Sequence, residues 1–206
     1  MKSGIFTQQG SIGCYEVDMP CKKQSEVLVR TLRSSICGSD LHVGYYGWGV
    51  DEFPLPPGFP GHESVCEVVD GEGTTYNENQ LVLAVPIISE ARSFSQYQVI
   101  GESQLLRIGK NISINEILMA QQLGTVIFAI RKLPELVGKS VVIIGQGSAG
   151  LFHTFMCKRL NASKIIAIEP VDVRCRISKE LGADIVIHSK DEHAQESVIE
   201  ITDGIG

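Results

Sequence analysis

The chain has 206 residues, enough for one large domain or two small ones. Its 18 basic and 24 acidic residues give a net charge of −6, which argues against nucleic acid or an anionic membrane as the main partner. No apolar run approaches the ~20 residues that span a bilayer, and the N-terminus lacks the apolar core of a secretory signal. The six cysteines are scattered, so we expect reduced thiols in a cytoplasmic protein.

The first half of the sequence predicts a β-rich domain, either a small barrel or a sandwich. Between Val27 and about Ile108, short runs of branched and aromatic residues alternate with clusters of Gly, Pro, Asn and Asp. The runs expected to form strands are VLVRTL, SVCEVVD, QLVLAVP and FSQYQVI. The segment from Asp51 to Glu63 contains four prolines and is predicted to be a loop.

Metal-ligand residue types lie on either side of this loop. Cys37 begins the sequence CGSDLH before the loop, and His62 and Glu63 end the loop. A thiolate, an imidazole and a carboxylate are all zinc ligands, and a catalytic zinc site uses three protein ligands and one open position. Each residue also has a plainer interpretation, because a lone buried cysteine is usually a packing residue. The residue types alone therefore leave zinc binding as a hypothesis.

Three polar residues within CGSDLH could assist such a site. Asp40 could hold the second imidazole nitrogen of His62, as outer carboxylates commonly do for histidine ligands. Ser39 and His42 could pass a proton between an alcohol at the open position and water.

The second half of the sequence predicts alternating helices and strands. The expected elements are a helix at 114–133 softly broken at Gly124, a strand at 141–144, a helix at 151–160, a strand at 164–168, a helix capped by Asp172 and running to Leu181, a strand at 183–188 and a helix at 194–202. We therefore predict an α/β chain with a β-rich domain at residues 1–113. Residues 114–206 are predicted to form the N-terminal half of a doubly wound, parallel-sheet domain.

A glycine-rich turn follows the first strand of that sheet. Gly145, Gly147 and Gly150 have the spacing G-x-G-x-x-G, and Glu169 ends the next strand 19 residues after Gly150. The glycines permit a tight turn, close approach of a pyrophosphate and close helix packing, while the helix N-terminus offers free N–H groups. The carboxylate can accept from both ribose hydroxyls and would repel the extra phosphate of NADP. The pattern predicts an NAD site.

Taken in order, CGSDLH, GHE, QLVLAVP and the glycine-rich turn resemble the zinc-dependent medium-chain dehydrogenase/reductase family. The resemblance covers essentially the whole chain and implies a GroES-like catalytic domain followed by a Rossmann domain. It also implies that Cys37 and His62 bind zinc and that Ser39 and His42 form a proton relay. The implied reaction interconverts an alcohol and an aldehyde or ketone, with hydride transfer to or from NAD.

Two departures from the family pattern affect the predicted metal sites. Many members carry a four-cysteine lobe for a structural zinc after the segment that matches LAVP. Here Val85 runs almost directly to Tyr97 without a cysteine, so one catalytic zinc and no structural zinc are expected. The third catalytic ligand is usually Cys or Glu, whereas this chain has Gln121 at that place. Either Gln121 or Glu63 is then the third ligand, and the glutamine favours a polyol or sugar substrate.

The sequence also predicts the cofactor-binding residues, the partners and the extent of the chain. The expected cofactor-binding residues are Gly145, Gly147, Ser148, Ala149, Gly150, Glu169 and Arg174, with Thr125 added from the resemblance. We expect a small-molecule alcohol substrate and, for the full-length protein, a homodimer or homotetramer. The chain ends after three strands of a sheet that needs about six, which indicates a fragment. A zinc-free NAD(P)H reductase of the same superfamily and a non-catalytic NAD-binding remnant are the alternatives.

Overall fold

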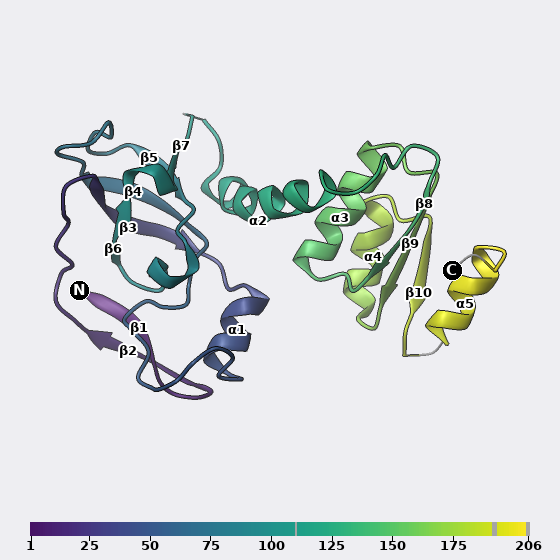
Figure 1. The fold of residues 1–206 in the computed structure, drawn as a ribbon, viewed down its shortest axis with the longest axis horizontal. Helices are drawn as coiled ribbons and strands as arrows, with labels where there is room; N and C mark the ends of the chain where they lie inside the picture. The colour runs from purple at the N-terminus through teal and green to yellow at the C-terminus, as the bar shows by residue number, and fades with distance from the viewer. Residues whose placement is uncertain (110, 191–192, 205–206) are drawn as a thin grey trace. The chain divides into compact units, whose positions relative to one another are not determined.

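The computed structural model describes residues 1–109, 111–190 and 193–204. These residues form two compact units, Met1–Gln121 and Gln122–Gly206, and helix α2 (Ile114–Ile130) contributes residues to both. Figure 1 shows the elements of each unit. The boundary predicted after residue 113 stays a prediction. None of the helices in the described part of the chain has the length and apolar character needed to cross a membrane.

The first unit is built on a five-stranded antiparallel sheet. Its strands, in spatial order, are β6 (Tyr97–Gly101), β3 (Glu26–Ser34), β4 (Ser64–Asp70), β5 (Leu81–Ala84) and β7 (Leu105–Arg107). A separate hairpin joins β1 (Lys2–Gln8) to β2 (Ser11–Glu16), and the short helix α1 (Gly38–Gly44) follows β3. Two 3-10 turns, Ile88–Glu90 and Glu102–Gln104, complete the unit.

Both faces of this sheet are covered by apolar side chains, because successive strand residues point to opposite sides. Cys66 and Val82 belong to one buried cluster. Val65 and Leu83, their neighbours in the chain, instead pack with Ile117 and Leu118 of α2 on the other face. The predicted strands are confirmed in β3 to β6, although β5 and β6 are shorter than the sequence runs indicated.

The second unit has a three-stranded parallel sheet in the order β10 (Ile185–His188), β9 (Lys164–Glu169), β8 (Ser140–Ile144). Helices α3 (Ser148–Arg159) and α4 (Asp172–Glu180) cover one face, and α5 (Ala194–Ile201) covers the other (Figure 1). Ile165 and Ala167 of β9 pack towards Cys157 of α3, whereas Ile166 packs towards Val198 of α5. The predicted alternation of strands and helices is confirmed.

Three details of the helix predictions were wrong. Helix α2 runs unbroken through Gly124 and ends at Ile130 instead of Leu133, because a single exposed glycine costs a helix only about 1 kcal/mol. Helix α3 begins at Ser148, three residues earlier than expected, since the glycine-rich turn itself ends at Gly147. Asp172 is the first residue of α4 and the extended Val171 precedes it.

The glycine-rich turn brings the start of α3 close to the end of β8. Gly145 has φ +85°, in the left-handed region that favours glycine. A Cβ on Gly150 would lie 1.9 Å from the carbonyl oxygen of Gly145, so no larger residue fits without a backbone shift. Gly147 has φ −65° and open space where its Cβ would stand.

We predict that Gly150→Ala destabilises the chain by roughly 1–3 kcal/mol, because the new methyl group meets a backbone oxygen that cannot rotate away. Gly147→Ala is the matched control, and its unfolding free energy should stay within about 0.5 kcal/mol of wild type. Urea unfolding of the three proteins measures both effects. Equal stability of the two variants would contradict the described packing of α3 on β8.

Candidate functional site

The candidate metal-ligand residues lie at one edge of the first sheet. Strands β3 and β4 are antiparallel, and Ser34 at the end of β3 pairs with Ser64 at the start of β4. Residues that follow β3 therefore lie beside residues that precede β4. The backbone N–H of Ser35 donates to the carbonyl of Glu63 over 3.2 Å, which continues the pairing beyond the strands. Cys37 is thereby brought next to the His62-Glu63 pair.

Cys37, His62 and Glu63 form a cluster of three ligand types. Each offers one ligand atom, and these atoms all lie within 4.8 Å of one another. Cys37 and His62 are half-buried and Glu63 is 3% exposed. These are the three zinc-ligand types that lie on either side of the proline-rich loop in the sequence, and the structure holds them in one place.

Asp40 connects two members of this cluster. Its Oδ2 accepts from the backbone N–H of Cys37 over 2.8 Å, and its Oδ1 lies 3.0 Å from Nδ1 of His62. Asp40 is 1% exposed, so water does not compete for either contact. Because Nδ1 faces Asp40, the other ring nitrogen, Nε2, is turned towards Glu63, 3.9 Å from Oε1. This is the contact that the sequence analysis proposed for Asp40.

Glu63 is held on its far side by Ser35. The Ser35 hydroxyl donates a short hydrogen bond to Oε2 of Glu63, leaving Oε1 directed at the imidazole. Ser35 was missed by the sequence analysis. Only the pairing of β3 with β4 brings Ser35 to Glu63, 28 residues later in the chain, and a lone serine before CGSDLH carries no such signal.

His62 has an unusual proton affinity in the absence of metal. Burial by itself lowers the pKa of His62. The hydrogen bond to Asp40 and the negative charge of that carboxylate together outweigh burial and raise the pKa to about 9. The Pro60 carbonyl, 3.3 Å from Nδ1, adds to the increase. A metal ligand must be neutral at the binding nitrogen, so metal binding here would release a proton.

The two predicted relay residues, Ser39 and His42, both lie on α1. A spacing of three residues puts them on the same face of the helix. Ser39 is half-buried and His42 is exposed. The His42 ring centre lies 5.8 Å from that of Tyr46 and 6.1 Å from that of Trp48. No hydrogen bond joins Ser39 to His42 in the described residues, so a relay would need a bound substrate or water between them.

The other residues implied by the resemblance lie on α2. Gln121 is half-buried at the end of the first unit, and Thr125 is exposed in the second. Both roles stay predictions.

The predicted nucleotide residues are gathered at the end of the second sheet. Gly147 precedes α3, and Ser148 and Ala149 are exposed at its first turn, where the backbone N–H groups have no intrahelical partner. Glu169 ends β9, beside β8. Room in front of Gly147 and a helix N-terminus of this kind suit a pyrophosphate.

Glu169 is only 2% exposed and is bound by the backbone around it. Its Oε2 accepts from the N–H of Gln146 over 2.6 Å, and its Oε1 accepts from the N–H of Val171 over 3.0 Å. Nη1 of Arg174, an exposed residue, lies 3.7 Å from Oε1. The structure therefore brings Glu169 and Arg174 together beside the turn.

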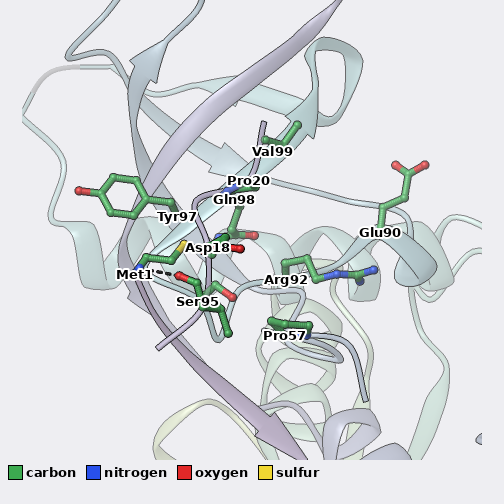
Figure 2. Close-up of a pocket in the computed structure, with 11 residues that line it drawn as sticks. Met1, Asp18, Pro20, Pro57, Glu90, Arg92, Ser95, Tyr97, Gln98 and Val99 are labelled. Atoms are coloured by element: carbon green, nitrogen blue, oxygen red, sulfur yellow. Dashed lines mark hydrogen bonds between the residues drawn. The ribbon is translucent and has the colours of Figure 1, made fainter. Parts of the chain in front are cut away.

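A separate hollow of about 480 Å³ lies on the first unit, lined by the N-terminal segment, the loop at 90–95 and β6 (Figure 2). Its two cationic groups already donate to backbone carbonyls, Met1 to Val17 and Arg92 to Ser89 and Ala91. None of the predicted site residues lines it. The hollow is therefore not the site that the sequence analysis predicted.

Comparisons with known proteins agree with this geometry. The alcohol dehydrogenase GroES-like domain family matches residues 23–113. L-Threonine 3-dehydrogenase of Pyrococcus horikoshii is 30% identical over 93% of this chain and 62% of its own. An alcohol dehydrogenase of Cupriavidus necator is 24% identical over 100% of this chain and 68% of its own. In solved structures, an alcohol dehydrogenase from Thermus sp. ATN1 has a TM-score of 0.85 at 25% identity, covering 100% of this chain and 68% of its own. Galactitol-1-phosphate dehydrogenase from Escherichia coli has a TM-score of 0.82 at 23% identity, covering 98% of this chain and 65% of its own.

Residues 23–113 match the alcohol dehydrogenase GroES-like domain family, and the relatives and solved structures together support a zinc-type medium-chain dehydrogenase/reductase family for this chain. The predicted fold class, a GroES-like domain followed by a partial Rossmann domain, is confirmed. The chain spans about 62% of the length of the threonine dehydrogenases that it matches.

The proton on His62 gives a testable pH dependence. Because the folded pKa of about 9 lies above the ordinary 6.5, protonated His62 stabilises the metal-free fold fully below pH 6.5, and this contribution is lost as the pH rises towards 9. Asp40→Asn removes the charge that raises the pKa. We therefore predict that wild type exceeds Asp40→Asn in unfolding free energy by more at pH 6 than at pH 9, measured in urea with a chelator present. A difference independent of pH would contradict this assignment.

Proposed function

We propose that this chain is the catalytic domain and the first half of the nucleotide domain of a zinc-dependent NAD(H) oxidoreductase. In this proposal residues 1–113 carry the metal and the substrate, and residues 114–206 bind the adenosine side of NAD. The reaction would interconvert an alcohol and the corresponding aldehyde or ketone. The observation that carries the proposal is the cluster of Cys37, His62 and Glu63, with Asp40 holding the imidazole.

The donor set suits zinc. A thiolate, a carboxylate and a neutral imidazole together supply two negative charges and leave a fourth tetrahedral position open, as in catalytic zinc sites. Ligand atoms around a tetrahedral zinc are about 3.5 Å apart, from the usual bond lengths. The separations of up to 4.8 Å in the cluster would need only a small inward movement of the side chains. This supports the proposal that Cys37, His62 and Glu63 are the ligands.

When bound, zinc would act as a Lewis acid that lowers the pKa of a coordinated alcohol. The residues around it have separate tasks. Asp40 engages Nδ1 of His62 and so leaves Nε2 available to a metal ion, and Ser35 binds Oε2 of Glu63 and so leaves Oε1 available. Ser39 and His42 would carry the proton from the substrate hydroxyl to water.

The glycine-rich turn would bind the cofactor. The N-terminus of α3 offers backbone N–H groups to the pyrophosphate, and Glu169 would accept from the adenosine ribose. Each carboxylate oxygen has two acceptor positions, so the backbone contacts of Glu169 leave one on each oxygen. Arg174 would swing aside to admit the ribose, because its exposed guanidinium lies next to Oε1. NAD is favoured over NADP by the charge of Glu169.

The relatives indicate the kind of substrate. Their names refer to L-threonine, to alcohols and to galactitol 1-phosphate, all of which carry an oxidisable hydroxyl group. We propose an alcohol, including a polyol or sugar, as the substrate of this protein. A homodimer or homotetramer of the full-length protein is part of the same proposal.

The direct test of the proposal is zinc content. We predict one zinc ion per chain after purification and dialysis, measured by atomic absorption, and its loss in Cys37→Ala. The exposed Cys14→Ala is a matched control that should keep its zinc. Two zinc ions per wild-type chain would contradict the expected lack of a structural zinc. A metal-free wild type that also fails to take up added zinc would favour the zinc-free reductase.

A second experiment decides the third ligand. We predict that Glu63→Gln weakens zinc binding by at least about tenfold. Substitution of a residue that only orients a ligand already lowers metal affinity by about 10–100-fold, and loss of a ligand charge should lower it at least as much. Gln121→Glu should leave the affinity unchanged if Gln121 does not bind the metal. Competition titrations against a chelator compare the two variants with wild type. Tighter zinc binding by Gln121→Glu, with little effect of Glu63→Gln, would make Gln121 the third ligand.

A further inference from the structure

The second residue of the glycine-rich turn, Gln146, is completely buried. Its Oε1 accepts from the hydroxyl of Thr154 over 2.8 Å and from that of Ser178 over 3.1 Å. Its Nε2 donates to the carbonyl of Gly145 over 3.1 Å. Thr154 lies on α3 and Ser178 on α4, and both are 0% exposed. One side chain thus ties the turn to two helices without any access of water.

The backbone of the same residue holds the acidic group beside the turn. The Gln146 N–H donates to Oε2 of Glu169 over 2.6 Å, the shorter of that carboxylate's two backbone contacts. The position of Oε2 of Glu169 therefore depends on the position of the Gln146 backbone. The buried amide is the group that fixes that backbone against α3 and α4.

We propose that Gln146, anchored by Thr154 and Ser178, is a positioning residue for Glu169 and thereby sets how strongly the site discriminates against a 2′-phosphate. This inference rests on the proposed NAD site. The anchor touches no cofactor itself. It acts by keeping one backbone N–H in place, so that the carboxylate stays where a ribose hydroxyl would meet it.

Loss of one anchoring hydroxyl should leave the fold intact. Ser178 and Gly145 would still hold the Gln146 amide if the Thr154 hydroxyl were removed. The turn would lose one of its tethers, and the backbone N–H of Gln146 would no longer be confined to one position. The carboxylate would follow it, so that both the attraction for a ribose hydroxyl and the repulsion of a 2′-phosphate should fall.

The test compares Thr154→Val, which keeps the shape and removes the hydroxyl, with Thr154→Ser, which keeps the hydroxyl. Dissociation constants of ADP-ribose and 2′-phospho-ADP-ribose are measured by calorimetry on the 206-residue chain. The preference is the ratio of the dissociation constant of 2′-phospho-ADP-ribose to that of ADP-ribose. We expect Thr154→Val and Gln146→Met to lower this ratio by about threefold to tenfold relative to wild type, the effect of losing one hydrogen bond. Thr154→Ser should keep the preference within about twofold of wild type. If Thr154 acted through packing alone, serine would lower the preference too, because it lacks the methyl group of threonine.

Controls separate this effect from general destabilisation. Gln98→Met is matched, because Gln98 is also a buried glutamine bonded to a threonine and a serine, but in the first unit. Any change that it makes in the melting temperature arises in the first unit, and it should leave the preference for ADP-ribose unchanged. If Thr154→Val fails to fold, Ser178→Ala takes its place and should also narrow the preference.

The outcomes distinguish this inference from the proposed function. If the wild-type chain binds ADP-ribose and neither anchor variant changes the preference, the role of Gln146 is wrong and the nucleotide site stands. If Thr154→Ser narrows the preference as much as Thr154→Val, the effect is one of packing and the inference is also wrong. If the wild-type chain binds neither ligand, the NAD site itself is wrong, and the inference falls with it.

Discussion

The contact on which the candidate active site depends is the one that Asp40 makes with two ligand residues at once. One carboxylate oxygen accepts from the backbone of Cys37 and the other faces Nδ1 of His62. A carboxylate buried this deeply is stable only if its oxygens are satisfied, so the contacts that stabilise Asp40 also fix the two ligands. The first turn of α1 and the end of the proline-rich loop are thereby held together.

The second unit contains a buried carboxylate that is held in the same way. Glu169 is also buried, and backbone N–H groups from Gln146 and Val171 satisfy its oxygens. In both units a strand ends near the site, a turn follows, and a carboxylate within or beside that turn accepts from its backbone. Backbone donors are held by the fold and do not rotate, so the acidic groups are oriented before any ligand arrives. This orientation supports the proposed roles in metal and cofactor binding.

Much of the fold could be predicted because its signals are local. Runs such as Val141–Ile144 and Lys164–Glu169 are short and β-branched, and glycines mark the turns between elements. The β1–β2 hairpin was missed because its strands contain Gly4 and Gly13 and lack a clear alternation. Helix α1 was missed because CGSDLH contains weak helix formers and was interpreted for its chemistry alone. These elements form through tertiary contacts, for instance the packing of the Phe6 ring on Tyr45.

The candidate site divides in the same way. The sequence alone singled out Cys37, His62 and Glu63 as candidate ligands and Asp40 as the partner of His62, because catalytic zinc sites use these residue types in these roles. Ser35 and the anchor of Gln146 could not be found, since a serine or a glutamine gains its role only when a distant partner is brought to it. The choice between Glu63 and Gln121 as third ligand also depends on side-chain placement that spacing does not encode.

X-ray absorption at the zinc edge of the zinc-loaded chain would test whether Cys37, His62 and Glu63 bind one zinc ion. We predict one sulfur neighbour at about 2.3 Å and nitrogen or oxygen neighbours at about 2.0–2.2 Å, including the signature of a single imidazole. Replacement of Cys37 by alanine should remove the sulfur neighbour. A spectrum with two or more sulfur neighbours, or with none in the wild-type chain, would contradict this set of zinc ligands.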